Sequence, residues 1–192
     1  MVDGHVGRDI IIYNAAVSAC ERSGHWAQAL QLLRAMVEDH VNMDTITYNA
    51  ALSTCEKGRE WLQALQLFRE LRLLVEMASA DVGLNTITYN AAISACEKNG
   101  QWDQALRLLV EMASAHVDLS TITYNAAVSA CEKGGQWHQA LRLLMGMASA
   151  HVELDSETYN AAINACEIAG EQAEILNLLF EMPFLQWSAL MR

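Results

Sequence analysis

The tetrapeptide Tyr-Asn-Ala-Ala occurs five times in this chain of 192 residues, beginning at Tyr13, Tyr48, Tyr89, Tyr124 and Tyr159. The steps between successive copies are 35, 41, 35 and 35 residues, and residues 86–120 agree with residues 121–155 at 28 of 35 positions. A repeat of this length is one supersecondary unit that is too small to bury its own apolar face. The chain is therefore predicted to be an array whose units are stabilised by stacking on their neighbours.

Each repeat is predicted to form two helices. The first half of residues 86–120 has apolar residues at helical spacing, which predicts a helix A. Asn99 and Gly100 then favour a turn, because both residue types accept a positive φ. From Gln101 to about Ala115, a second stripe of Trp, Ala, Leu and Met residues predicts helix B. We therefore predict an all-α fold, a right-handed α-solenoid (superhelix) of stacked antiparallel helical hairpins.

The predicted domain boundaries follow the repeat. Residues 1–9 are interpreted as the remnant of a preceding repeat, and residues 183–192 as a C-terminal tail that begins at Pro183. Between them, five repeats cover residues 10–182, with these bounds: 10–44, 45–85, 86–120, 121–155 and a partial repeat at 156–182.

The second repeat carries six extra residues within helix B. Six residues advance a helix by about 600°, so the apolar stripe cannot stay in phase through the insertion. We expect an overlong or kinked helix from roughly Trp61 to Ala80, with altered stacking.

Cysteine and tryptophan are copied with the repeat. Each cysteine follows a repeat Tyr by seven residues and so lies on the same helical face: Cys20, Cys55, Cys96, Cys131 and Cys166. A small apolar thiol is among the most buried side chains, so we interpret all five as buried, reduced thiols of an intracellular protein. Four tryptophans follow a Tyr by thirteen residues and are interpreted as packing wedges between hairpins rather than base-stacking groups: Trp26, Trp61, Trp102 and Trp137.

Several classes of function are disfavoured by the sequence. No run reaches the ~18 apolar residues that a membrane-spanning helix requires, and no secretory signal precedes the array. The sequence shows no Cys-x-x-Cys pair, no Gly-rich phosphate loop and no nucleophile with a paired base, so we expect no enzyme activity, no cofactor, no metal and no small-molecule substrate. The formal net charge of −11 opposes nucleic-acid binding through phosphates.

The repeat nevertheless resembles the pentatricopeptide repeat family, in its P-type-like form. The resemblance rests on Thr-Tyr-Asn, a basic residue after helix A, and Ala-Leu and Glu-Met in helix B, from about Ile10 to Met182. The 35-residue step favours this family over the 34-residue tetratricopeptide repeat, whose Trp-Leu-Gly and closing Pro patterns are absent. The resemblance implies a single-stranded RNA binder in which each repeat reads one base. It also implies RNA processing, stabilisation or editing in a chloroplast or mitochondrion, although no targeting peptide is visible.

The resemblance further implies that the Asn after each Tyr selects a base together with the last residue of its repeat. The pairs are Asn14 with Asp44, Asn49 with Asn85, Asn90 with Ser120, and Asn125 with Asp155, whereas Asn160 has no partner because the pattern ends after Pro183. The family's pairing rules assign uracil to the first and fourth pairs, a pyrimidine to the second and cytosine to the third. The expected RNA is therefore U-pyrimidine-C-U. The residues alone leave open that each Asn only satisfies backbone groups in the first helical turn.

Two further sets of residues match the family. Ile11, Ile46, Ile87 and Ile122 correspond to the aliphatic residue that sandwiches a base. Glu157 replaces it in the last repeat, so we expect the fifth unit to read no base. Arg22, Lys57, Lys98 and Lys133 correspond to a cation that faces phosphate. Each of these follows a Glu, so a solvated Glu and Lys pair is an equal alternative.

An alternative function is an α-solenoid scaffold whose acidic groove holds a protein partner. Near the repeat end, the stretch His116-Val117-Asp118-Leu119 and similar stretches carry an acidic side chain where the family usually has a basic one, and repulsion should weaken RNA binding. Four stacked bases would contribute roughly 4 to 12 kcal/mol. The cost of association is of similar size, so we expect this segment to bind RNA weakly by itself.

Overall fold

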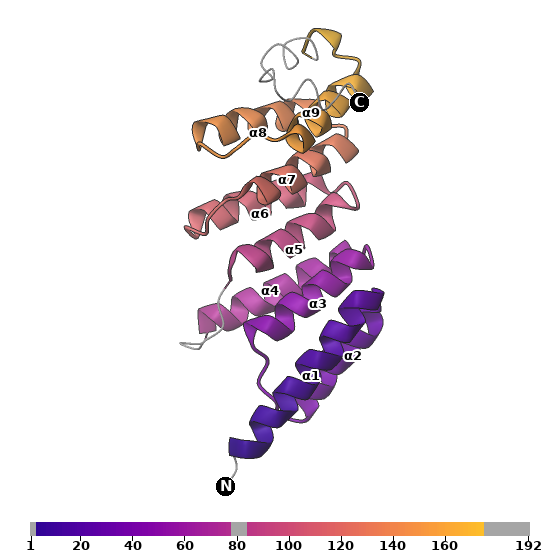
Figure 1. Cartoon of the computed structure of the whole chain (residues 1–192), viewed down its shortest axis with the longest axis vertical. Coiled ribbons are helices and arrows are strands. Elements are labelled where there is room, and N and C mark those ends of the chain that lie inside the picture. Colours follow the sequence, from indigo (N-terminus) through magenta and orange to yellow (C-terminus); the bar gives the residue numbers. More distant parts are fainter. Residues whose placement is uncertain (1–2, 78–83, 175–192) are drawn as a thin grey trace. The chain divides into compact units, whose positions relative to one another are not determined.

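The computed structural model describes residues 3–77 and 84–174, which are all-α and contain no strand (Figure 1). The described helices are α1 (Asp3–Ser23), α2 (Trp26–Glu38), α3 (Thr45–Lys57), α4 (Trp61–Met77), α5 (Thr86–Glu97), α6 (Trp102–Ser114), α7 (Thr121–Lys133), α8 (Trp137–Ser149) and α9 (Ser156–Ala169). Odd-numbered helices are the predicted helix A and even-numbered ones helix B. The predicted all-α fold of repeated helical hairpins is confirmed. No described helix is long and apolar enough to cross a membrane.

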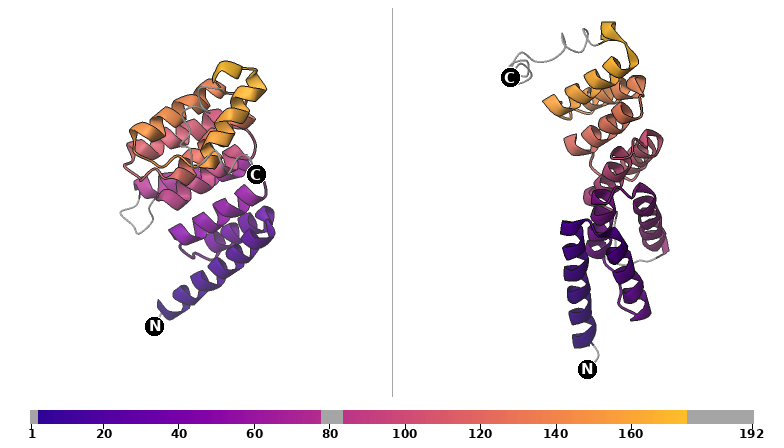
Figure 2. Two further views of the ribbon diagram at one scale, coloured as in Figure 1. Left: turned by 45° about the horizontal axis from the view of Figure 1, so that its top comes forward. Right: turned by 90° about the vertical axis from the view of Figure 1, so that its right-hand side faces the viewer.

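The chain divides into two compact units, Met1–Ala95 and Cys96–Arg192. In the first unit α1 packs on α2, α3 packs on α4, and α1 lies beside α3. In the second unit α7 packs on α8, and α7 lies beside α9. Figure 2 shows the same pairing from two further directions. In each unit, therefore, equivalent residues of successive A helices are brought side by side.

The A helices begin at side-chain caps that the sequence supplies at each repeat end. The carboxylate of Asp44 accepts the backbone N–H of Thr47 at 2.8 Å, and that of Asp155 accepts the backbone N–H of Thr158 at 2.9 Å. Asn85 and Ser120 cap α5 and α7 in the same way. Asp, Asn and Ser are the preferred residues at this position, because their side chains satisfy an N–H group that the helix leaves free. The repeat-end residues predicted to select bases therefore also start the helices.

The turns that follow α1 to α3 and α5 to α9 use left-handed backbone conformations, and the turn after α4 lies outside the described residues. Gly100 has the expected positive φ of 63° after α5, and Gly24, Gly135 and Gly170 adopt similar values. The histidines that follow the B helices do so as well: His40, His116 and His151 have φ values of 55° to 56°. A non-glycine residue is rare in this region, so each of these histidines has a role as a helix-ending residue.

The Tyr and Cys side chains that recur from repeat to repeat lie in the interior. Four of the repeat tyrosines are buried, and so are Cys55, Cys96, Cys131 and Cys166. Burial raises the pKa of Cys55, Cys96 and Cys131 to about 12, so these thiols stay protonated. The interpretation as buried structural cysteines is confirmed for four of the five. Cys20 is only half-buried.

Tryptophan packs between hairpins in both units. A Cβ atom added at Gly58 would lie 2.6 Å from Cδ1 of Trp26, and one added at Gly134 would overlap Cδ1 of Trp102. Each ring therefore sits directly against the end of the next helix A, where only glycine leaves room for it. The predicted wedge role is confirmed for Trp26 and Trp102.

Two predicted boundaries lie near the ends of the described residues. Residues 1–9 are predicted to be the remnant of a preceding repeat, and α1 begins at Asp3 and includes residues 3–9. The predicted tail after Pro183 lies outside the described residues.

The second repeat contains the predicted overlong helix. Helix α4 has 17 residues, whereas α2, α6 and α8 have 13 each. Its buried residues Ala64, Phe68 and Leu71 keep the spacing of Ala29, Leu33 and Met36 in α2. The ring of Phe68 meets that of Tyr89 edge to face, with centroids 5.0 Å apart. The apolar stripe therefore stays in phase up to Leu71, and the expected end near Ala80 lies outside the described residues.

Candidate functional site

The first predicted base-selecting pair forms a three-residue hydrogen-bond network with a threonine. The Asn14 amide nitrogen lies 3.4 Å from both carboxylate oxygens of Asp44. The hydroxyl of Thr47 lies 2.5 Å from the Asn14 amide oxygen and 2.8 Å from Asp44 Oδ1. Because a carboxylate only accepts, it fixes which end of the amide faces it. The structure therefore brings Asn14 and Asp44 together, as the family pairing implies.

The fourth pair repeats this network with one addition. The Asn125 amide nitrogen lies 3.2 and 3.1 Å from the two carboxylate oxygens of Asp155, and Thr158 donates its hydroxyl to the Asn125 amide oxygen. A second carboxylate reaches the same amide nitrogen, since Glu157 Oε2 lies 3.5 Å away. Asn125 is only 9% exposed, whereas Asn14 is half-buried.

The Asp155 carboxylate has an altered pKa. Burial raises it, but the hydrogen bonds from the backbone and hydroxyl of Thr158, from the Asn125 amide and from the backbone of Glu157 together lower the pKa below its usual value. Asp155 is therefore a carboxylate, and a pure hydrogen-bond acceptor, at neutral pH.

The remaining predicted residues occupy equivalent places within their own units. The hydroxyl oxygen of Thr88 lies 2.7 Å from the amide oxygen of Asn49 and 3.1 Å from that of Asn85. Asn90, in the first unit, is half-buried, and Ser120, in the second, caps α7. Asn160 is half-buried on α9, and the residues that would complete its repeat lie outside the described part of the chain.

The threonine of each network was not predicted from the sequence. Thr47, Thr88, Thr123 and Thr158 are completely buried, each three residues after a repeat end. An Asp, Asn or Ser followed by a hydroxyl three residues later is a helix-start signal. That spacing predicts the cap, but the link from threonine to an Asn 33 or 39 residues earlier needs the stacked helices.

The four isoleucines predicted to sandwich bases are exposed. Their exposed fractions are 68% for Ile11, 63% for Ile46, 62% for Ile87 and 67% for Ile122. Each isoleucine lies three residues before the Asn of its repeat, which is about one helical turn away along helix A. A single exposed isoleucine is ordinary, but here the same exposure recurs at the equivalent position of four repeats. Glu157 is exposed at the same place in the fifth repeat.

Two of the predicted phosphate-facing cations form ion pairs between repeats. Lys57 Nζ lies 3.0 Å from Glu21 Oε1, and Lys133 pairs with Glu97 in the same way. The partner is thus the Glu of the preceding repeat rather than the adjacent Glu that the sequence suggested. Arg22 is exposed at the end of α1, and Lys98 is half-buried. The four cations lie at equivalent helix ends, and Lys57 and Lys133 remain 45% and 43% exposed at their side chains.

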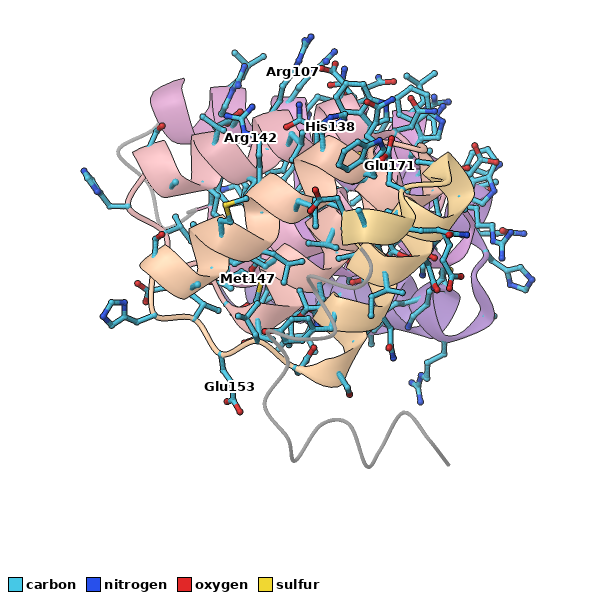
Figure 3. The ribbon with its side chains drawn as sticks, turned by 90° about the horizontal axis from the view of Figure 1, so that it is seen from above. Arg107, His138, Arg142, Met147, Glu153 and Glu171 are labelled. Carbon is cyan, nitrogen blue, oxygen red and sulfur yellow. The ribbon has the colours of Figure 1, made fainter. Side chains whose placement is uncertain are left out.

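The side of α6 and α8 from which Arg107, His138 and Arg142 project carries charges of both signs, because Glu171 lies on the same side (Figure 3) and Arg107 pairs with Asp103 at 3.0 Å. Glu153 lies on the opposite side, on the connection between α8 and α9. The immediate surroundings of Asn125 are acidic, because the carboxylates of Asp155 and Glu157 both lie near its amide nitrogen. Among the described residues, no group of three His, Cys, Asp or Glu side chains is arranged to hold a metal ion.

Comparison with known proteins identifies the repeat. A family profile described as the pentacotripeptide-repeat region of PRORP matches residues 11–183. The chain belongs to the pentatricopeptide repeat family. The pentatricopeptide repeat match covers nearly all the described residues. Among curated proteins, no match was found.

Solved pentatricopeptide repeat structures have the same fold. The maize protein PPR10 is 26% identical over 90% of this chain, with a TM-score of 0.69. A structure of PPR10 with an 18-nucleotide psaJ RNA element is 24% identical over 93% of the chain, with a TM-score of 0.74. This chain spans about a quarter of the length of PPR10, 24% and 25% in the two structures. It spans 97% of the PPR domain of Arabidopsis thaliana PRORP1, solved with tRNA, which is 12% identical over 95% of this chain with a TM-score of 0.75.

Proposed function

We propose that this pentatricopeptide repeat array binds single-stranded RNA, with one base read by each of its first four repeats. The observation that carries the proposal is the set of four isoleucines, each more than 60% exposed at the same place beside an Asn. An exposed aliphatic side chain can cover the face of any base, because every base has an apolar face. The proposal is supported by the RNA-bound structures of PPR10 and PRORP1, which share the fold. It assigns binding, and no catalysis, to this chain.

The hydrogen bonds at Asn14 leave room for a base. An Asn side chain has two N–H groups and two acceptor lone pairs. In the network, Asp44 takes one N–H and Thr47 occupies one lone pair. One donor and one acceptor remain on the half-buried amide, which complements the mixed edge of a pyrimidine such as uracil. Asp44 and Thr47 therefore orient the reading amide rather than replace the base.

The family's pairing rules then define the expected RNA. They assign uracil to the first position, a pyrimidine to the second and cytosine to the third, read 5′ to 3′ along the chain. The fourth pair, Asn125 with Asp155, has the same residue types as the first and by those rules takes uracil. We further propose a role in chloroplast or mitochondrial RNA processing, stabilisation or editing, where partner proteins would act on the bound RNA.

Substitution at a repeat end tests the proposal without disturbing the helix. Ser120→Asp keeps a preferred N-cap residue on α7, so folding should be preserved. By the family's pairing rules, Asp in place of Ser at this repeat end should change the third position from cytosine to uracil. Fluorescence anisotropy with short RNAs that differ only in the third base should show a reversal of preference of roughly fivefold or more, the discrimination of one good base contact.

The matched control is Ser120→Asn, which also caps the helix. This variant should lack the preference for uracil over cytosine that is expected for Ser120→Asp. Circular dichroism of all three proteins should give the same helicity. The proposal fails if the wild-type chain binds matched and scrambled RNAs equally at physiological salt. In that event the acidic surface would favour a protein partner instead.

A further inference from the structure

Repeats one and four have the same selecting pair but different neighbours. Both combine an Asn with an Asp at the repeat end and a buried Thr three residues later. The residue immediately before this Thr is Ile46 in the first network and Glu157 in the fourth. Pairing rules that consider only Asn and Asp give the two positions the same base, whereas the structure gives them different surroundings.

The difference is in the hydrogen-bond donors that remain on the Asn. The amide nitrogen of Asn14 has one carboxylate beside it, that of Asp44 at 3.4 Å. Asn125 has Asp155 at 3.1 Å and Glu157 at 3.5 Å around its amide nitrogen, so both N–H groups have a carboxylate acceptor. Its oxygen accepts from Thr158 and keeps one lone pair. The fourth position therefore offers an incoming base acceptors only.

An acceptor-only site disfavours uracil. The Watson–Crick edge of uracil has one N–H between two carbonyl oxygens, and both oxygens would face the Glu157 carboxylate or its neighbours. Guanine presents two adjacent donors, N1–H and N2–H2, which match the two oxygens of one carboxylate. Cytosine and adenine each offer a single amino group there. Glu157 is exposed, so its side chain is accessible to a base that reaches Asn125.

We propose that Glu157 is a specificity-determining residue that makes the fourth position select guanine over uracil. The inference rests on the proposed RNA-binding function and changes the target from U-pyrimidine-C-U to U-pyrimidine-C-G. It also gives Glu157 a role in the fourth repeat's reading, although the residue belongs to the fifth repeat in sequence.

The experiment measures base preference at the first and fourth positions of one RNA set. Four RNAs carry each base at position four, and four more carry each base at position one, with all other bases fixed. Wild-type protein should bind guanine about tenfold more tightly than uracil at position four, the effect of one bidentate contact. At position one the same protein should prefer uracil.

Matched variants exchange the two environments. Glu157→Ile gives the fourth position the neighbour of the first, so its preference should change to uracil. Ile46→Glu should move the first position from uracil towards guanine. Glu157→Gln keeps the size of the side chain but adds donors, so it should remove the guanine preference. Because residues 46 and 157 are exposed, circular dichroism should show unchanged folding for all three variants.

The outcomes separate the two proposals. A wild-type protein that prefers uracil at both positions, or that shows no preference at position four, would overturn the role of Glu157 and leave RNA reading intact. A protein that shows no base preference at any position, or does not bind these RNAs, would overturn the proposed function and this inference with it.

Discussion

Asn14 in the first unit and Asn125 in the second occupy equivalent positions of their repeats but have different neighbours. Asn14 is half-buried beside an exposed isoleucine, whereas Asn125 is 9% exposed and has two carboxylates around its amide nitrogen. The selecting pair and the orienting threonine are unchanged. The surroundings of this Asn therefore depend on the first turn of the following repeat as well as on its own repeat. Two repeats with the same Asn and Asp pair are not chemically equivalent.

The contacts that hold neighbouring hairpins together are, by contrast, the same in both units. Trp26 against Gly58 corresponds to Trp102 against Gly134, and the ion pair of Lys57 with Glu21 corresponds to that of Lys133 with Glu97. The comparison thus separates stacking contacts that both units share from the surroundings of the Asn, which differ between them. Substitutions in matched positions of the two units can test each part.

The largest expected effect is steric, at the tryptophan wedge. Gly134→Ala would place a methyl group onto the ring of Trp102, and Gly58→Ala would place one 2.6 Å from Trp26 Cδ1. Neither glycine has a positive φ, so the cost is overlap alone. We expect each variant to lower the free energy of unfolding by about 3 kcal/mol, the upper end for overpacking, measured by urea denaturation.

Gly146→Ala is the control for this pair, because a methyl group there meets nothing within 4 Å. In the interior of α8 it should instead stabilise the protein by about 0.5–1 kcal/mol. A neutral Gly58→Ala beside a destabilising Gly134→Ala would show that the two units do not share one stacking contact.

Much of this stacking structure follows from the sequence, whereas the reading networks do not. Tyr and Cys are seven residues apart within one helix, so a helical period alone places them on the same face and predicts their burial. Asn125 and Glu157 are 32 residues apart, and they meet only because α9 lies beside α7. A local sequence pattern predicts that Asp44 caps a helix, but it does not show that the same carboxylate also contacts the Asn14 amide.

The next effect concerns the buried threonine of each network. Thr158→Val keeps the shape but leaves the Asn125 amide oxygen and Asp155 without the hydroxyl donor. A buried group that loses its partner costs about 1–3 kcal/mol. We expect about 2 kcal/mol for Thr158→Val and about 1 kcal/mol for Thr47→Val, since the bond of Thr47 to Asn14 is only partly buried.

Urea denaturation of both variants gives this difference directly. Thr158→Ser is the control, because it keeps the hydroxyl and should recover most of the lost stability. Equal costs at the two threonines would contradict the view that the fourth network is the more enclosed one.

The smallest expected effect on stability separates the two roles of the interrepeat lysines. Lys57→Gln and Lys133→Gln each break an exposed ion pair, which should cost less than about 1 kcal/mol. If the same lysines also face phosphate, each variant should weaken binding to every RNA alike and reduce the slope of log affinity against log salt by about 1.

Glu21→Gln and Glu97→Gln are the matched controls. They break the same pairs but release the lysine, so RNA binding should strengthen if the lysine reaches phosphate. An unchanged salt slope in all four variants would leave these lysines with a role in stacking only. The acidic array would then bind RNA through contacts of its isoleucines with the RNA bases.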